Sequence, residues 1–268
     1  MKVVVIGAGI GGLVCAISCR REGLDVVVLE QAPGLKPVGA GIQIPPNAAR
    51  IVRKLGLLPQ LLEKAILVDT IDYLRYKDGK VLFQIEAGDK IKKAYGDIWM
   101  VIARPHYHDV LWNAAKEAGV ELRLGSEAVE IDFEDPSVRL ATGEVVSGDV
   151  VIGADGLWSR SRDQILGRHS PPSETGDLAY RATVSLQQMK DFGDPRIDDM
   201  IKHKTVKCWM GPNKHCVLYP IDGGQMFNLV ILCPDDLSKD VRQAPGDVEE
   251  MRALFAGWDE RYIQSTAP

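Results

Sequence analysis

Residues 2–12 read Lys2-Val-Val-Val-Ile-Gly7-Ala-Gly9-Ile-Gly-Gly12, and residues 25–30 read Asp25-Val-Val-Val-Leu-Glu30. An apolar run leads into the pattern Gly-x-Gly-x-x-Gly, and an acidic residue ends the second apolar run. The order of strand, glycine turn, helix, strand and acid is typical of a dinucleotide-binding βαβ unit. This stretch therefore predicts a nucleotide-binding domain of the α/β class.

Each glycine of the turn has its own expected role. Gly7 permits the tight turn after the strand, Gly9 lets a pyrophosphate approach the backbone, and Gly12 lets the helix pack close to the sheet. The N-terminus of the helix then presents free N–H groups to the phosphates. A glycine-rich turn that binds nothing is the alternative reading.

The acid at the end of the second strand predicts which nucleotide binds. Glu30 can accept hydrogen bonds from ribose hydroxyls, whereas its charge would repel a 2′-phosphate. The pattern therefore favours a nucleotide other than NADP at this site.

Composition limits the class of protein. The 268 residues are 46% hydrophobic and 26% charged, as in ordinary globular proteins, and suffice for one large or two medium domains. A net charge of −5 argues against nucleic acid and anionic membranes as partners. We expect no transmembrane segment. The five cysteines form no CxxC pair, and the histidines lack metal-ligand spacing, so we expect a reduced, cytoplasmic protein with no metal.

Hydrophobic patterning separates the chain into two kinds of region. The first is an alternation of strands and helices, and the second, from about residue 178 to 233, is rich in strands. We expect a Rossmann-like domain over 1–175, with 68–95 giving strands to the other side, and a mostly antiparallel β-rich substrate domain over 176–268. The expected elements are strands at 2–6, 25–29, 70–85 (a hairpin), 121–124, 128–133, 137–140, 149–153, 179–184, 206–209, 216–219 and 227–232, helices at 10–22, 46–54, 57–64 and 105–118, and a loop at 31–45.

A second dense motif runs Asp149-Val-Val-Ile-Gly-Ala-Asp155-Gly156-Leu-Trp-Ser159-Arg-Ser-Arg162. Asp155 follows an apolar strand at its carboxyl end, where ligands collect in open α/β sheets. Ser159 is suited to cap a following helix. Asp155 is thus a candidate ligand residue, or alternatively only an acceptor of hydrogen bonds within its own turn.

Together these motifs resemble a known family. Gly-x-Gly-x-x-Gly is followed by Val38-Gly39-Ala40-Gly41-Ile42-Gln43-Ile44-Pro45-Pro46-Asn47-Ala48, by Ala103-Arg104, and by the Asp155-Gly156 motif. This order is similar to the FAD-dependent aromatic monooxygenases of the salicylate-hydroxylase-like group. The later segments Ala179-Tyr180-Arg181, Tyr219-Pro220-Ile221 and Asn228-Leu-Val look most like the fungal members.

The resemblance implies roles for matching residues. Gly7, Gly9, Gly12 and Glu30 would hold the ADP half of FAD, and Gly39 and Gly41 would lie on a loop that passes beside the flavin. Arg104 matches an arginine that contacts the cofactor. Asp155 matches a motif associated in the family with both FAD and the reductant NAD(P)H. Arg181 and Tyr219 match residues taken to hold a phenolate substrate. Surface ion pairing of the arginines and core packing of Tyr219 are the structural alternatives.

The resemblance also implies a reaction. NAD(P)H would reduce FAD, O₂ would add to give a flavin C4a-hydroperoxide, and a phenolic ring would take up its terminal oxygen. The family's further motif, Gly-Asp followed by Ala and His after the β-rich domain, does not occur before Pro268. The expectation is therefore a chain lacking the C-terminal part of the FAD domain, with a homodimer as one consequence of uncovered surface. A weakly active or non-catalytic FAD-fold protein and an NAD-dependent oxidoreductase are the alternatives.

Overall fold

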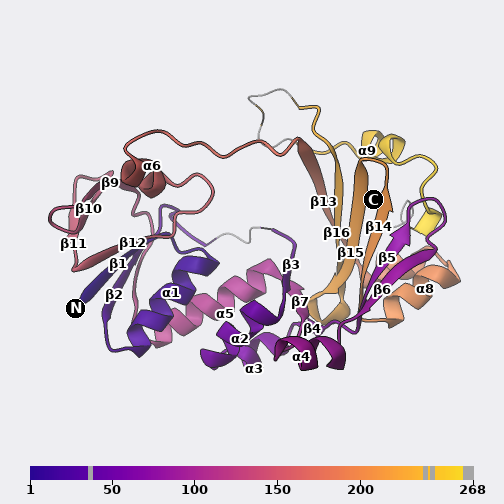
Figure 1. Ribbon diagram of the computed structural model, residues 1–268, viewed down its shortest axis with the longest axis horizontal. Helices are drawn as coiled ribbons and strands as arrows, with labels where there is room; N and C mark the ends of the chain where they lie inside the picture. The colour runs from indigo at the N-terminus through magenta and orange to yellow at the C-terminus, as the bar shows by residue number, and fades with distance from the viewer. Residues whose placement is uncertain (36–38, 238–240, 242–244, 262–268) are drawn as a thin grey trace. The chain divides into compact units, whose positions relative to one another are not determined.

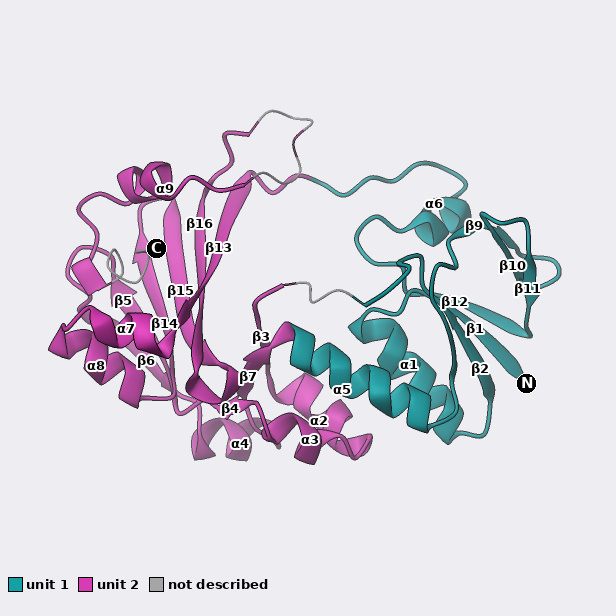
Figure 2. Cartoon of the chain, turned by 180° about the vertical axis from the view of Figure 1, so that it is seen from behind, with its two compact units in different colours: residues 1–38, 105–173 teal, residues 39–104, 174–268 magenta. Residues whose placement is uncertain are grey.

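A computed structural model describes residues 1–35, 39–237, 241 and 245–261. The predicted loop 31–45 and the predicted domain 176–268 each include residues outside this description. The chain packs as two compact units, coloured separately in Figure 2. Unit 1 combines Met1–Val38 with Pro105–Ser173, and unit 2 combines Gly39–Arg104 with Glu174–Pro268.

A four-stranded parallel sheet forms the centre of unit 1, in the order β12-β1-β2-β8. Its strands are β1 (Lys2–Ile6), β2 (Asp25–Leu29), β8 (Glu121–Arg123) and β12 (Val150–Gly153). After their first residue β1 and β2 are wholly buried, which explains their continuous apolar sequences. The predicted α/β class with a βαβ start is confirmed.

Both faces of this sheet are covered by other parts of unit 1. Helix α1 (Ile10–Arg21) packs on one face through Leu13, Ala16 and Ile17. On the other face, a small antiparallel sheet buries Val138 and its neighbours against Val4 of β1. That sheet contains β9 (Ala128–Asp132), β10 (Ser137–Leu140) and β11 (Val145–Ser147). Helices α5 (Arg104–Glu117), whose first residue groups with unit 2, and α6 (Arg160–Leu166) complete the regular structure of the unit (Figure 1 and Figure 2).

Unit 2 is built on a six-stranded sheet in the order β13-β16-β15-β14-β5-β6. Its strands are β5 (Thr70–Arg75), β6 (Val81–Glu86), β13 (Asp177–Ser185), β14 (Thr205–Gly211), β15 (Lys214–Ile221) and β16 (Met226–Pro234). Every neighbouring pair is antiparallel except β14 with β5. The predicted β-rich, mostly antiparallel region is confirmed.

A three-stranded antiparallel sheet adds to unit 2, formed by β3 (Gly41–Ile44), β7 (Met100–Ala103) and β4 (Ile66–Leu67). The helical segments of the unit are α2 (Pro46–Lys54), α3 (Leu58–Leu62), α4 (Asp89–Tyr95), α7 (Leu186–Asp191), α8 (Pro195–Lys202), α9 (Val248–Leu254) and the short turn η1 (Asp222–Gly224).

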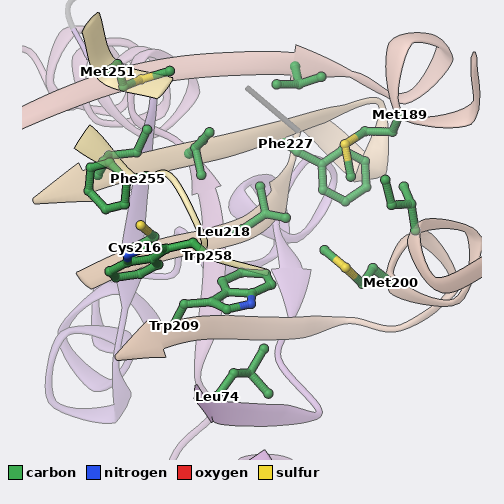
Figure 3. Packing of buried hydrophobic residues seen from close by; sticks show 14 of the residues in the cluster. Leu74, Met189, Met200, Trp209, Cys216, Leu218, Phe227, Met251, Phe255 and Trp258 are labelled. Atoms are coloured by element: carbon green, nitrogen blue, oxygen red, sulfur yellow. The ribbon is translucent and has the colours of Figure 1, made fainter. Parts of the chain in front are cut away.

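The large sheet separates two hydrophobic cores. One core gathers around the buried Trp209, with Phe255, Trp258 and Met200 beside it (Figure 3). The other core contains Val206 and Tyr219 together with residues of β4 and β7. Side chains alternate between the faces of a strand, so neighbouring residues of β14 contribute to different cores.

The structure corrects one expected element. The loop predicted over 31–45 contains a strand, β3, because Gly41–Ile44 pairs with Met100–Ala103 in the opposite direction. The Gly-rich composition of 31–45 suggested only a loop, and the partner strand lies far away in sequence. The domain boundary at 175/176 stays a prediction; in packing, the whole of 39–104 groups with 174–268.

Candidate functional site

The three glycines of the turn occupy different surroundings. Gly7 has a φ of +103°, and a Cβ there would lie 2.5 Å from the Ala154 carbonyl oxygen. A Cβ on Gly12 would collide with the Gly7 carbonyl oxygen. A Cβ on Gly9 would have no atom within 4 Å. Gly7 and Gly12 are therefore required by the fold, whereas Gly9 leaves space that a ligand can use.

Ala8, in the middle of the turn, is held through both of its backbone groups. Its N–H donates to Glu30 Oε2 at 2.9 Å, and its carbonyl oxygen accepts from His108 Nε2 at 2.8 Å. Glu30 Oε1 also accepts from the Ala32 N–H at 2.9 Å. Sequence reasoning rejected His108 as a metal ligand and missed this contact, since no local pattern links α5 to the turn.

A cavity of about 400 Å³ lies at the carboxyl ends of β1, β2 and β12. Four of the predicted residues line it, namely Gly7, Gly9, Glu30 and Asp155. Gly12 lies outside the lining, in agreement with its packing role. The remaining lining residues are Ile6, Leu29, Gln31, Ser126, Ala128, Ala154, Gly156, Leu157, Trp158 and Arg160. The volume lies in the range of small-molecule sites.

Asp155 is held by the start of helix α6. Its carboxylate accepts from the Ser159 hydroxyl at 2.7 Å and from the Ser161 N–H at 2.9 Å. Burial alone would raise the pKa of Asp155, but these hydrogen bonds outweigh burial and keep the pKa below its ordinary value. Ser159 Oγ accepts from the Arg162 N–H, so the predicted helix cap is confirmed. Asp155 therefore accepts hydrogen bonds within its own turn and also lines the cavity, so both readings made from the sequence describe it.

In unit 2, Gly39 lies against Arg104. Gly39 has a φ of +87°, and a Cβ there would lie 2.9 Å from Arg104 Cδ. The Arg104 N–H donates to the Ala40 carbonyl oxygen at 2.9 Å. The arginine and the glycine-rich loop, more than sixty residues apart in sequence, are therefore adjacent. Val38, the first residue of the matching loop motif, lies outside the described residues.

Gly41 lies against two residues of the large sheet. A Cβ on Gly41 would be 2.7 Å from Tyr219 Cε2 and 2.8 Å from Asn228 Cβ. The Gly41 N–H donates to Asn228 Oδ1 at 2.9 Å. Asn228 appeared in the sequence only as part of a motif, and its contact with Gly41 depends on the tertiary fold.

Arg181 and Tyr219 lie on one face of the large sheet. Arg181 of β13 pairs with Val230 of β16, and Val230 pairs with Val217 of β15. Tyr219 lies two residues after Val217 on β15, so its side chain is on the same face of the sheet. The Arg181 side chain is exposed, whereas Tyr219 is 4% exposed. Burial raises the pKa of Tyr219 to about 12, and the positive charge of Arg181 acts in the opposite direction. Tyr219 is therefore a neutral hydroxyl at ordinary pH.

Each unit thus presents its own group of candidate residues. Gly7, Gly9, Glu30 and Asp155 gather in unit 1, and Gly39, Gly41, Arg104, Arg181 and Tyr219 belong to unit 2. Within the described ranges, no cluster of His, Cys, Asp and Glu suits a metal ion. No helix in the described part of the chain has both the length and the apolar character to cross a membrane.

Comparison with known proteins identifies relatives along most of the chain. The chain is 40% identical over 264 residues to the FAD-dependent monooxygenase OpS4 of Beauveria bassiana, and the aligned region covers 97% of this chain and 61% of that protein. It is 33% identical over 260 residues to a 3-hydroxybenzoate 6-hydroxylase of Klebsiella oxytoca, covering 96% of this chain and 63% of that protein. The chain thus spans just over three-fifths of the length of these curated relatives.

Solved structures share the same fold. The tetrameric form of 2-methyl-3-hydroxypyridine-5-carboxylic acid oxygenase has a TM-score of 0.77 at 27% identity, covering 99% of this chain and 67% of that one. Klebsiella pneumoniae HpxO, complexed with FAD and uric acid, also has a TM-score of 0.77, at 23% identity, covering 99% and 64%. The second likeness concerns the fold alone. Residues 1–258 match the FAD binding domain family, and the chain belongs to that family.

Proposed function

We propose that this chain forms the FAD- and substrate-binding part of a monooxygenase that hydroxylates a phenolic or other aromatic substrate with NAD(P)H and O₂. The observation that carries the proposal is the cavity at the carboxyl ends of the parallel strands, lined by Gly9, Glu30 and Asp155. The names of the relatives, which include 3-hydroxybenzoate 6-hydroxylases, support the class of substrate.

The geometry of unit 1 fits the ADP half of FAD. The open side of Gly9 gives a pyrophosphate access to the backbone at the start of α1. Glu30 is fixed by two backbone N–H groups and, as a carboxylate, has lone pairs left for ribose hydroxyls. Asp155, held charged by α6, lies on the same cavity. Gly7 and Gly12 would contribute to FAD binding indirectly, by allowing the backbone conformation and close packing of the turn.

Unit 2 offers groups suited to the flavin side and to the substrate. Gly39 and Gly41 give a loop with little side-chain bulk, and Arg104 would add a positive charge beside it. Arg181 would favour the ionised form of a phenol, and the neutral Tyr219 hydroxyl would hydrogen-bond to the phenolic oxygen. When bound, FAD would supply the oxygen-transfer chemistry, and the protein would orient the ring and exclude water.

Two further expectations belong to the whole protein. We propose a cytoplasmic location, which rests on the unpaired cysteines and ordinary composition of the chain. A homodimer is also proposed; among the described residues, the edge strand β6 exposes Val81, Leu82 and Phe83. Sedimentation or light scattering of the purified protein tests the dimer.

The decisive experiment is a spectrum followed by a turnover assay. Purified protein is expected to show the visible bands of oxidised flavin, and 3-hydroxybenzoate or a related phenol is expected to accelerate NADH or NADPH oxidation. Flavin bands without phenol-stimulated oxidation would favour a non-catalytic FAD-fold protein. Nicotinamide turnover by a protein that binds no flavin would favour an NAD-dependent oxidoreductase instead.

A further inference from the structure

Asn228 is a polar side chain in the interior of the large sheet of unit 2. It is 0% exposed, and it lies on β16 between Thr183 of β13 and Tyr219 of β15. A buried carboxamide costs free energy unless its hydrogen-bonding groups find partners. Asn228 therefore needs an explanation that packing alone does not provide.

One half of the carboxamide has a partner. Asn228 Oδ1 accepts from the Gly41 N–H at 2.9 Å, at the first residue of β3. The same Gly41 lies so close to Tyr219 that a Cβ would be 2.7 Å from the Tyr219 ring. Asn228 thus holds the backbone of Gly41 against the ring of Tyr219.

The other half of the carboxamide has no partner among the described residues. Asn228 Nδ2 is buried, and no described acceptor lies within hydrogen-bonding distance. An apolar side chain of similar shape would avoid the cost of this unpaired donor. An apolar side chain could not, however, accept the hydrogen bond from the Gly41 N–H. This bond is therefore the interaction that distinguishes asparagine from an apolar residue at position 228.

The turn that Asn228 holds contacts two further candidate residues. Gly39 lies against the Arg104 side chain, and Gly41 lies against Tyr219. We propose that Asn228 is a positioning residue, which anchors the Gly39–Gly41 turn so that its backbone and Tyr219 keep a fixed separation. This inference rests on the proposed function, in which the turn faces the flavin and Tyr219 faces the phenol.

The anchor would govern how efficiently oxidation leads to hydroxylation. If the turn moves away from Tyr219, the phenolic ring is no longer held at the distance at which oxygen is transferred. NADH and O₂ with one proton then yield NAD⁺ and hydrogen peroxide, and no hydroxylated product forms. Asn228 would act through Gly41 and Tyr219, and substrate contact is not required of it.

The first test measures the anchor directly and needs neither flavin turnover nor substrate. In the purified protein, Asn228→Leu removes the acceptor while keeping the branching and the number of side-chain heavy atoms, and Asn228→Asp keeps the acceptor. Exchange of the Gly41 amide is expected to be about tenfold faster in Asn228→Leu, as for loss of one hydrogen bond, and near wild type in Asn228→Asp. Thr183→Val, at the neighbouring register position, is the matched control. Unchanged exchange in a folded Asn228→Leu protein would overturn the proposal.

The second test measures product formed per NADH oxidised, with 3-hydroxybenzoate as the probe. Asn228→Leu and Gly41→Ala are each expected to lower this ratio at least twofold, and the double variant to lower it no further, because both changes displace the same turn. Additive losses, or wild-type coupling in Asn228→Leu, would overturn the positioning role. Absence of phenol-stimulated oxidation in the wild-type protein would instead reject the proposed function, and the exchange measurement would still decide the anchor.

Discussion

The surroundings of individual glycines separate folding from ligand binding. Gly9 has an extended backbone with a φ of −70°, and no atom lies where its Cβ would be. Gly9→Val is therefore expected to fold normally but to weaken flavin binding at least about tenfold, or ~1.4 kcal/mol, by filling the cavity. Gly11→Val is the matched control, because Gly11 is equally open but does not line the cavity. Fluorescence titration with FAD measures the effect; equal affinities for the two variants would contradict the assignment.

Arg181 gives a second prediction at this scale. Arg181→Ala is expected to leave flavin bound but to lower the yield of hydroxylated product per NADH, because in the proposed site it removes the positive charge that would favour the phenolate. Arg181→Lys restores that charge and serves as the control, and Tyr219→Phe should show a milder loss. Wild-type coupling in Arg181→Ala would show that the arginine has only a structural role.

Tyr219 also predicts a pH dependence of stability. Its pKa is about 12 in the folded protein and about 10 when exposed, so the folded state keeps this proton at higher pH than the unfolded state. The resulting contribution to the free energy of unfolding, ~3 kcal/mol, is complete below pH ~10 and is lost as pH rises toward ~12. Urea unfolding followed from about pH 9, below both pKa values, to about pH 12 should show a steeper decline of stability in wild type than in Tyr219→Phe. Equal slopes would mean that the hydroxyl is accessible.

At the scale of elements, helix α5 supports the glycine turn through one side chain. His108 Nε2 donates to the Ala8 carbonyl oxygen at 2.8 Å. His108→Leu is expected to raise the FAD dissociation constant up to about tenfold, the usual effect of one hydrogen bond. Asp109→Ala, an exposed change on the same helix, is the control. FAD affinity in His108→Leu equal to that of the control would show that the turn needs no such support.

Elements differ in how far the sequence predicts them. The βαβ start and the hairpin at 70–85 depend on neighbouring residues, so apolar runs and turn residues were enough to locate them. Strand β3 was missed because its order comes from β7, nearly sixty residues later. The same distinction between local and distant contacts applies to the candidate residues. Glycines in motifs could be named from the sequence, whereas Asn228 acquires its contact with Gly41 only when strands from distant segments meet.

At the scale of the whole molecule, unit 2 is closed by residues late in the described chain. The buried Asp259 carboxylate accepts from Trp209 Nε1 at 2.8 Å and from Arg261, which also donates to the Gly79 carbonyl oxygen at 3.1 Å. Asp259→Ala is expected to lower the free energy of unfolding by ~3 kcal/mol, because it removes the buried carboxylate that accepts from Trp209 Nε1 and balances the charge of Arg261. Glu260→Gln, an exposed neighbouring change, should have little effect. Urea denaturation measures both; similar midpoints would mean that the network is dispensable.

The pairing of β14 with β5 has a consequence for how the protein is made. Thr70 of β5 lies beside Thr205 of β14, and the two are separated by 135 positions in the chain. A ribosome adding roughly 5–20 residues per second needs about 7–27 s to cover that interval. During this time the hairpin of β5 and β6 has been synthesised, but one of its edges has no neighbour. On the nascent chain, β5 therefore cannot pair with β14 before β14 has been synthesised, and until then the edge of β5 that β14 covers in the folded protein stays unpaired.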